Sequence, residues 1–189
     1  SRFIVAPPQR KSAGVVPETV RKDGYMFFYA STPDCHKNFE TLCSAARLLE
    51  KEVGEGVFKV VLTLSGEENR YSRWLRKEWG DVKSVDFAGF MSKERLYGHY
   101  KSADCLVFPS RVETWGLPIT EYIEASPHGT MLLADLPYSH ETASGASKVC
   151  FFDPSDPVQL KDRMKELINN DCVMLAPVPV QQIQDPQAG

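Results

Sequence analysis

Short apolar runs alternate along most of this chain with longer stretches in which apolar residues recur at helical spacing. Such runs are typical of parallel strands covered on both faces, and the stretches between them are typical of crossover helices. The pattern therefore predicts an α/β fold with a doubly wound, Rossmann-like sheet of six parallel strands. The predicted strands cover residues 24–31, 58–66, 84–90, 105–110, 130–136 and 148–153.

Helices are predicted in the intervals between these runs. Ser92 and Asp156 are suitable N-terminal caps for two of them. One helix is predicted to begin directly after Gly116. Apolar spacing predicts further helical residues at 39–49, 71–79, 96–100 and 160–168, and at most a short helix within residues 137–145.

The predicted helix at residues 71–79 carries two tryptophans among arginine and lysine side chains. One interpretation is a basic helix that lies on a membrane surface. We favour a solvated outer face with aromatic anchors in the core, because long basic side chains can cover apolar surface while their charges stay in water.

The two ends of the chain depart from this pattern. Proline, glutamine and small residues dominate before about residue 25 and after about residue 172. We predict an N-terminal extension or linker at residues 1–24, one domain at 25–172 and a Pro/Gln-rich tail at 173–189. The length of 189 residues suits one α/β domain and is short for two.

Composition narrows the class of protein. With 42% hydrophobic and 25% charged residues, the chain lacks the signature of a disordered protein. A net charge of −3 without a basic arm argues against a nucleic-acid binder, and no apolar run approaches the roughly 20 residues that span a bilayer. The five cysteines form no CxxC pair. We expect a reduced, cytoplasmic protein without a metal site, and peripheral contact with the inner face of the cell membrane stays open.

A ligand site is predicted where the strand order reverses. For the order 3-2-1-4-5-6, the loops at residues 32–38 and 111–116 should face each other beyond the first and fourth strands. Neither GxGxxG nor a P-loop is present, so the helix start after Gly116 is the candidate for holding a phosphate. Lys37 either adds a positive charge there or is a solvated loop lysine.

Two glutamates lie near this predicted phosphate site. Glu113 precedes the helix, and Glu121 is expected in its first turn. Carboxylates would repel phosphates, so hydroxyl groups of a ribose or a sugar suit them better. For Glu121, a favourable charge at a helix start is the alternative interpretation.

The segment ETWGLPITE, from Glu113 to Glu121, resembles the E-x7-E signature of the group 1 family of retaining, nucleotide-sugar-dependent glycosyltransferases with the GT-B fold. SADCLVFPSRVETWGLPITE and the following LLADLPYSHET resemble bacterial members that build capsular and surface polysaccharides. HKNFETL resembles the lysine-bearing first loop of the family. The resemblance covers roughly Tyr25 to Asn170, and as a set these motifs are specific.

The resemblance implies that the chain is the C-terminal, donor-binding half of such an enzyme. Glu121 would bind the ribose, and Glu113 would contact hydroxyls of the donor sugar near the reacting carbon. Lys37 would hold the diphosphate leaving group together with backbone amides, so Glu113 and Lys37 form the predicted catalytic pair. The predicted donor- and nucleotide-binding residues are Glu121, Gly116, Leu117, Thr114, Gly89, Phe90, Met91 and His36, of which 89–91 would lie against the base and His36 would touch phosphate.

Some features depart from the pattern of the family, and two residues have alternative roles. Ser31 stands where many members carry an arginine that pairs with the loop lysine. His140 and Glu141 either approach the donor sugar or belong to a surface loop. The stretch between Glu121 and Asp135 is longer than in close relatives and contains Pro127 and His128, so the helix after the signature is expected to end early. The resemblance also implies that the acceptor-binding N-terminal domain of the family is not part of this sequence.

The function expected from the resemblance is that of a metal-independent hexosyltransferase in polysaccharide biosynthesis. Its donor would be a UDP-, GDP- or TDP-linked sugar, its acceptor a glycan or glycolipid, and this chain alone would bind without transferring. The alternatives are a stand-alone nucleotide-sugar-binding module and a non-catalytic interaction domain. A sugar phosphorylase is disfavoured, because its chemistry needs a pyridoxal-phosphate lysine and a far longer chain.

Overall fold

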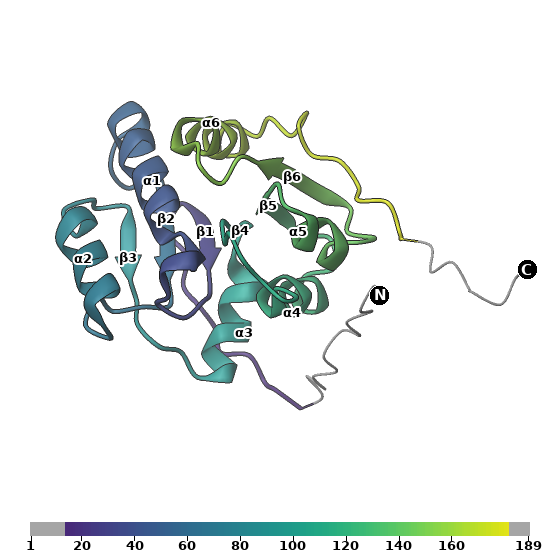
Figure 1. The fold of residues 1–189 in the computed structure, drawn as a ribbon, viewed down its shortest axis with the longest axis horizontal. Helices are drawn as coiled ribbons and strands as arrows, with labels where there is room; N and C mark the ends of the chain where they lie inside the picture. The colour runs from purple at the N-terminus through teal and green to yellow at the C-terminus, as the bar shows by residue number, and fades with distance from the viewer. Residues whose placement is uncertain (1–13, 182–189) are drawn as a thin grey trace, which may run out of the picture.

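One parallel sheet of six strands forms the centre of the molecule, seen in the computed structural model of Figure 1, which describes residues 14–181. The strand order is β3-β2-β1-β4-β5-β6, as predicted. Each pair of neighbouring strands is parallel. The strands are β1 (Tyr25–Tyr29), β2 (Phe58–Leu62), β3 (Val85–Phe87), β4 (Cys105–Phe108), β5 (Thr130–Ala134) and β6 (Lys148–Phe152), and all of them lie within the predicted runs.

Helices cover both faces of the sheet and make the doubly wound arrangement. On one face α1 packs against α2 and α6, and on the other α3 packs against α4 (Figure 1). The two central strands, β1 and β4, are consequently buried, which accounts for their continuous apolar sequence. The helices are α1 (Phe39–Val53), α2 (Arg70–Trp79), α3 (Lys93–Ser102), α4 (Leu117–Ala125), α5 (Pro137–Thr142) and α6 (Pro157–Ile168), with a 3-10 turn η1 (Cys35–Lys37) before α1.

The helix starts follow from local sequence. The Ser92 side chain accepts a hydrogen bond from the Arg95 amide at 3.3 Å, and that of Asp156 accepts one from the Gln159 amide at 2.9 Å. Both predicted caps are therefore confirmed. Helix α4 begins directly after Gly116 and ends at Ala125, before Pro127, also as predicted.

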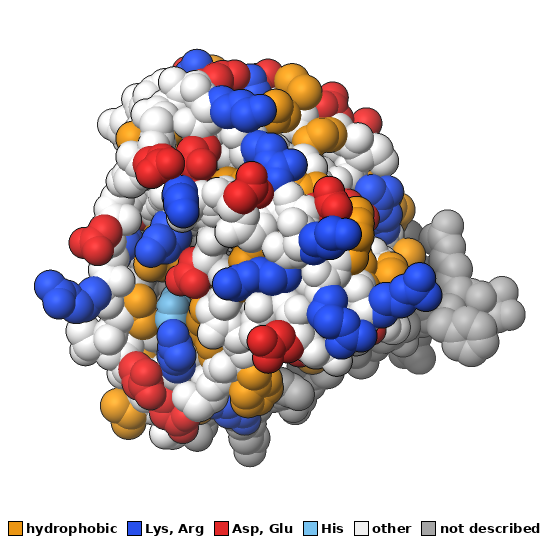
Figure 2. Space-filling model, turned by 90° about the vertical axis from the view of Figure 1, so that its left-hand side faces the viewer, with side chains coloured by type: hydrophobic (Ala, Val, Ile, Leu, Met, Phe, Trp, Pro, Cys, Tyr) orange, Lys and Arg blue, Asp and Glu red, His pale blue; other side chains and the backbone are white. Residues whose placement is uncertain are grey.

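The basic helix α2 anchors in the core through one side. Leu75 is fully buried and Trp79 nearly so, whereas Trp74 is half-exposed. Figure 2, which views the molecule from the side where α2 lies, shows lysine and arginine side chains interspersed with aspartate and glutamate. This mixture is typical of a solvated outer face.

The described parts of the two chain ends make contacts with the domain. The Glu18 amide donates to the Glu94 carbonyl at 3.0 Å, and Lys22 pairs with Asp104 at 2.7 Å. At the other end, Ala176 forms an antiparallel bridge with Val149 of β6. The predicted domain boundaries stay a prediction, although Glu18 contacts α3 and Ala176 contacts β6.

The cysteines of residues 14–181 are free thiols. Cys43, Cys105 and Cys150 are buried, while Cys35 and Cys172 are exposed. Burial raises the pKa of each of the three buried thiols, so they pack as small apolar side chains. In the same part of the chain, no helix combines the length and the apolar character needed to cross a membrane.

Candidate functional site

A pocket of about 720 Å³ lies beyond the carboxyl ends of the central strands. Its walls come from the loops that follow β1, β2, β3 and β4 and from the helices α3 and α4. The loops after β1 and β4 face each other as predicted, because the Arg111 amide donates to the His36 carbonyl at 2.9 Å. The pocket therefore occupies the switch point where ligands bind in doubly wound sheets.

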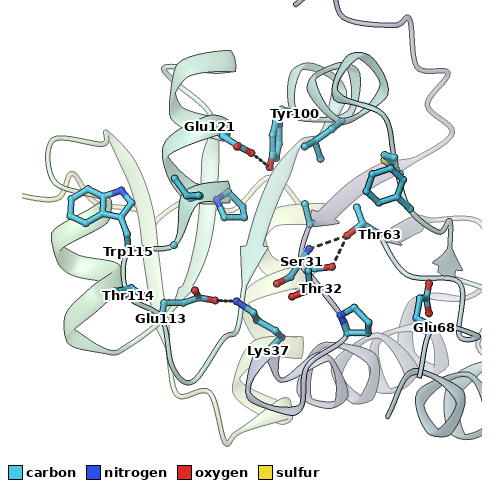
Figure 3. Close-up of a pocket in the computed structure, with 18 residues that line it drawn as sticks. Ser31, Thr32, Lys37, Thr63, Glu68, Tyr100, Glu113, Thr114, Trp115 and Glu121 are labelled. Atoms are coloured by element: carbon cyan, nitrogen blue, oxygen red, sulfur yellow. Dashed lines mark hydrogen bonds and ion pairs between the residues drawn. The ribbon is translucent and has the colours of Figure 1, made fainter. Parts of the chain in front are cut away.

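Lys37 and Glu113 meet across this pocket. Lys37 Nζ lies 2.5 Å from Glu113 Oε1, and the two side chains are only 15% and 12% exposed. Figure 3 shows this pair at one side of the pocket. Lys37 is thus an ion-paired residue and not a solvated loop lysine.

Asn38 anchors the loop that carries Lys37. It has a left-handed backbone with φ of +56°, and it is fully buried. Its amide donates to the carbonyls of Pro109, at 2.9 Å, and Pro154, at 2.8 Å. Because these carbonyls follow β4 and β6, Asn38 fixes the first loop to the neighbouring strands, a role that the sequence analysis missed.

Gly116 opens helix α4 with a left-handed backbone. Pro118 has no N–H, and the Ile119 amide donates to the Gly116 carbonyl at 3.0 Å. The amide of Leu117 belongs to the first turn of the helix, where N–H groups have no intrahelical acceptor, and the amide of Gly116 directly precedes this turn. They and Thr114 line the pocket, so a helix N-terminus suited to an anion lies where it was predicted.

Glu121 is not in the first turn of α4, contrary to our expectation. The helix begins at Leu117, so Glu121 is its fifth residue, and the interpretation as a favourable charge at a helix start is wrong. Its side chain is buried, with 8% exposure, and lines the pocket. The Tyr100 hydroxyl of α3 donates to Glu121 Oε2 at 2.9 Å, opposite the side where Lys37 lies (Figure 3).

The loop after β3 contributes an exposed aromatic ring. Phe90 is 91% exposed and, with the buried Met91, lines the pocket. Gly89 is not among the lining residues and has a positive φ of +80°. Phe90 and Met91 thus form part of the pocket wall, while Gly89 provides the turn before them.

Ser31 and Thr63 tie the loops after β1 and β2 together on the pocket wall. The Ser31 amide donates to Thr63 Oγ1 at 2.9 Å, and this hydroxyl donates to the Ser31 carbonyl at 3.0 Å. Among the described residues that line the pocket, Lys37 is the one cation. Ser31 therefore contributes polar backbone and a short side chain where the family resemblance leads one to expect an arginine.

Glu68, which the sequence analysis did not single out, also lines the pocket. Its carboxylate accepts hydrogen bonds from the amides of Ser65, at 2.5 Å, Gly66, at 3.1 Å, and Glu67, at 3.2 Å. Burial raises the pKa of this carboxyl, but hydrogen bonds, led by that from Ser65, outweigh burial and lower the pKa to about 2. Glu68 is therefore ionised and holds the turn after β2 in place.

Two histidines proposed near the ligand are not among the described residues that line the pocket. His36 is exposed and is not among the lining residues, although its carbonyl helps to join the two facing loops. His140 stacks on Phe151 with ring centroids 3.7 Å apart and lies 2.7 Å from Asp135. Neither His140 nor Glu141 lines the pocket, which favours their surface role.

These features define a doubly wound α/β domain whose switch-point pocket joins a helix N-terminus, one lysine and three carboxylates, those of Glu68, Glu113 and Glu121. The chain belongs to the family of glycosyl transferases group 1, whose sequence profile matches residues 16–179. No sequence among curated proteins matches the chain.

Solved structures share the fold at low sequence identity. TarM is 16% identical, with a TM-score of 0.64 over 82% of this chain and 30% of its own. A UDP-forming α,α-trehalose-phosphate synthase from Burkholderia vietnamiensis is 11% identical, with a TM-score of 0.61 over 76% of this chain and 37% of its own. An E. coli structure described as trehalose-6-phosphate bound with UDP-2-fluoro glucose is 14% identical, with a TM-score of 0.59 over 76% of this chain and 36% of its own. The chain thus spans about a third of each of these proteins.

Proposed function

We propose that this chain is the nucleotide-sugar donor-binding domain, the C-terminal half of a GT-B fold, of a retaining and metal-independent glycosyltransferase. The enzyme would transfer a hexosyl group to a glycan or glycolipid acceptor in polysaccharide biosynthesis. The observation that carries this proposal is the order of groups along one pocket. The buried carboxylate of Glu121 lies at one side, the Lys37–Glu113 pair lies at another, and the amides that open α4 belong to the same wall.

Each group suits one part of a nucleotide sugar. Amides of Gly116 and Leu117, together with Lys37, are suited to the diphosphate, because a helix N-terminus and a cation both stabilise negative charge. Cleavage of the sugar–phosphate bond develops further charge on that leaving group, so these preorganised groups would also lower the barrier. Glu113 and Glu121 would accept hydrogen bonds from hydroxyls of the sugar and the ribose.

The base would lie toward the loop after β3. Phe90 offers an exposed aromatic face there, and stacking on such a face is favourable for any base. The solved E. coli relative that contains UDP-2-fluoro glucose supports a nucleotide-sugar ligand for this fold. The base, the sugar and the acceptor of this chain are left open by the proposal.

The test is a magnesium-free calorimetric titration of the chain with UDP, GDP and TDP. We expect one nucleotide to bind and Lys37→Ala and Glu121→Ala to weaken it. Glu124→Ala is the matched control, because Glu124 is an exposed carboxylate of the same helix and should leave affinity unchanged. At 100 times its dissociation constant, a ligand should stabilise the fold by roughly 2.7 kcal/mol, which a thermal shift detects. Absence of binding by all three nucleotides would contradict the proposal.

A stand-alone binding module is the second candidate, and Ser31 is the observation that favours it. With Lys37 as the one cation among the described lining residues, the pocket would bind a diphosphate while stabilising its departure less strongly. Both candidates predict nucleotide binding. They differ in whether a longer protein that contains this domain transfers the sugar, which a transfer assay on that protein decides.

A further inference from the structure

The Tyr100 hydroxyl joins helices α3 and α4 at the pocket wall. Tyr100 is fully buried, and its hydroxyl donates to Glu121 Oε2 at 2.9 Å. Both residues line the pocket, so the carboxylate that the proposed function assigns to the ribose is held by a side chain from a different helix. The two residues are 21 positions apart in the sequence.

The ring of Tyr100 is fixed by its surroundings. It meets Phe28 of β1 edge-on with centroids 5.5 Å apart, and it packs against Tyr97 and Tyr122 at 5.6 and 6.1 Å. Its carbonyl accepts a hydrogen bond from the Ser126 hydroxyl at 3.1 Å, just beyond the end of α4. A ring held on several sides places its hydroxyl at one point.

The chemistry of the contact sets its direction. Burial raises the pKa of Tyr100 well above its ordinary value, and the nearby Glu121 raises it further, so the phenol stays protonated and donates. A hydrogen bond to a buried carboxylate is stronger than one between neutral groups, and its loss leaves the carboxylate under-solvated.

We infer that Tyr100 is a positioning residue that orients the Glu121 carboxylate to accept hydrogen bonds from the ribose hydroxyls of a bound nucleotide. This inference rests on the proposed function. Without the phenol, the carboxylate of Glu121 can rotate toward other donors. Ribose recognition is then lost while the diphosphate and base contacts stay.

The test compares Tyr100→Phe with Tyr122→Phe by calorimetry. Two ligands are titrated. The first is the one of UDP, GDP and TDP that binds best, and the second is the same nucleotide without its ribose hydroxyls. Tyr122 is the matched control, because it is also a buried tyrosine beside the pair but its hydroxyl lacks a hydrogen-bond partner among the described residues. We expect Tyr100→Phe to bind the complete nucleotide about tenfold more weakly and the hydroxyl-free nucleotide unchanged. Tyr122→Phe should alter neither affinity.

A purely structural role predicts a different result. Equal losses for the two ligands in Tyr100→Phe, or no loss for either, would overturn the inference while leaving the proposed function intact. If the wild-type chain binds no nucleotide, the proposed function fails and the inference fails with it.

A double variant keeps the test decisive even if Tyr100→Phe does not fold. In Tyr100→Phe with Glu121→Gln, position 121 is neutral, so the loss of the Tyr100 hydroxyl no longer removes a donor from a buried carboxylate. The inference predicts that this double variant binds the complete nucleotide as Glu121→Gln alone does. A further tenfold loss would show that Tyr100 acts independently of Glu121 and would overturn the inference.

Discussion

Lys37 and Glu113 neutralise each other in the structure, so a ligand that uses either side chain must compete with the other. Their side chains are largely shielded, and the atoms lie 2.5 Å apart. A nucleoside diphosphate would draw Lys37 away from Glu113. A nucleotide sugar would do the same but would also offer hydroxyls to the released carboxylate.

This competition makes a counterintuitive prediction for Glu113→Gln. Bare nucleoside diphosphate should bind about three- to tenfold more tightly, because an ion pair that competes with the ligand and contributes about 1 kcal/mol is removed. The additional affinity for the nucleotide sugar should shrink, because Gln accepts sugar hydroxyl hydrogen bonds less strongly than a carboxylate. Calorimetry with both ligands measures the two effects, and Glu124→Gln serves as control. Weaker binding of the bare nucleotide would contradict the ion-pair exchange.

At the scale of elements, the start of α4 depends on one backbone conformation. Gly116 has a φ of +84°, and a Cβ placed there would lie 3.3 Å from Ile119 Cδ1. Gly56, before β2, has a similar φ of +79°, but nothing lies within 4 Å of its Cβ position. Alanine substitutions at the two positions therefore distinguish the effect of backbone strain alone from the effect of strain at the pocket.

We expect Gly116→Ala and Gly56→Ala each to lower the free energy of unfolding by about 1–2 kcal/mol, the cost of a left-handed backbone in an L-residue. Gly116→Ala should be the more damaging of the two, because its methyl group also crowds Ile119. Only Gly116→Ala should weaken nucleotide binding, since it displaces the amides that open α4. Urea unfolding and titration of both variants test this, and a normal affinity in Gly116→Ala would argue against a phosphate site at this helix start.

The elements themselves were predictable because their causes are local. Apolar runs identify the six strands, and Ser92 and Asp156 cap the helices that follow them. The sequence analysis did not predict the cap of α2. Asn69 and Ser72 hydrogen-bond to each other's backbone there, but Ser72 stands where the usual capping box has Glu or Gln. The pocket position and the loop pair also followed from strand order.

Several side-chain contacts of the site were not predictable in the same way. The Tyr100–Glu121 bond joins two helices, and Asn38 reaches carbonyls 71 and 116 positions away. Such partners depend on the packed arrangement and leave no spacing pattern in the sequence. Glu68 carries a local signal, because its carboxylate lies within reach of the amides of the three residues before it, but an acidic turn residue has many alternative roles.

At the scale of the whole molecule, stability should depend on pH through His99. Its ring is buried and stacks on Phe28, and Nδ1 lies 2.8 Å from the Arg95 carbonyl. Because a carbonyl only accepts, Nδ1 carries the proton. Burial lowers the pKa of His99, so the folded protein favours the neutral ring.

As the pH falls through about 6.5, His99 takes up its second proton in the unfolded chain before it does so in the folded protein. The folded state therefore loses stability from about pH 6.5 downward. The contribution of one histidine is at most about 1.4 kcal/mol per pH unit. Urea unfolding between pH 7.5 and 5.5 should show this loss, and His99→Asn should flatten it. His128→Asn is the control at an exposed histidine. An unchanged slope in His99→Asn would exclude His99 as its source.

The chain spans 30% to 37% of the length of the solved relatives named above, and its pocket is open. Under our proposal, this chain would supply the leaving-group contacts and one wall around the sugar. The part of the enzyme that binds an acceptor and excludes water would lie outside these 189 residues. Leaving-group stabilisation alone supplies part of the rate enhancement, since positioning of the second reactant contributes a comparable share.

We therefore expect the chain to bind a nucleotide sugar without cleaving it. Incubation with the donor that binds should release nucleoside diphosphate no faster than donor alone in buffer, as followed by phosphorus NMR. Water serves as the acceptor in this assay, so the result does not depend on knowing the natural acceptor, and Glu113→Gln controls for contaminating hydrolases. Release that exceeds the buffer rate and disappears in Glu113→Gln would mean that this domain alone holds a complete active site, with Glu113 acting on the reacting sugar.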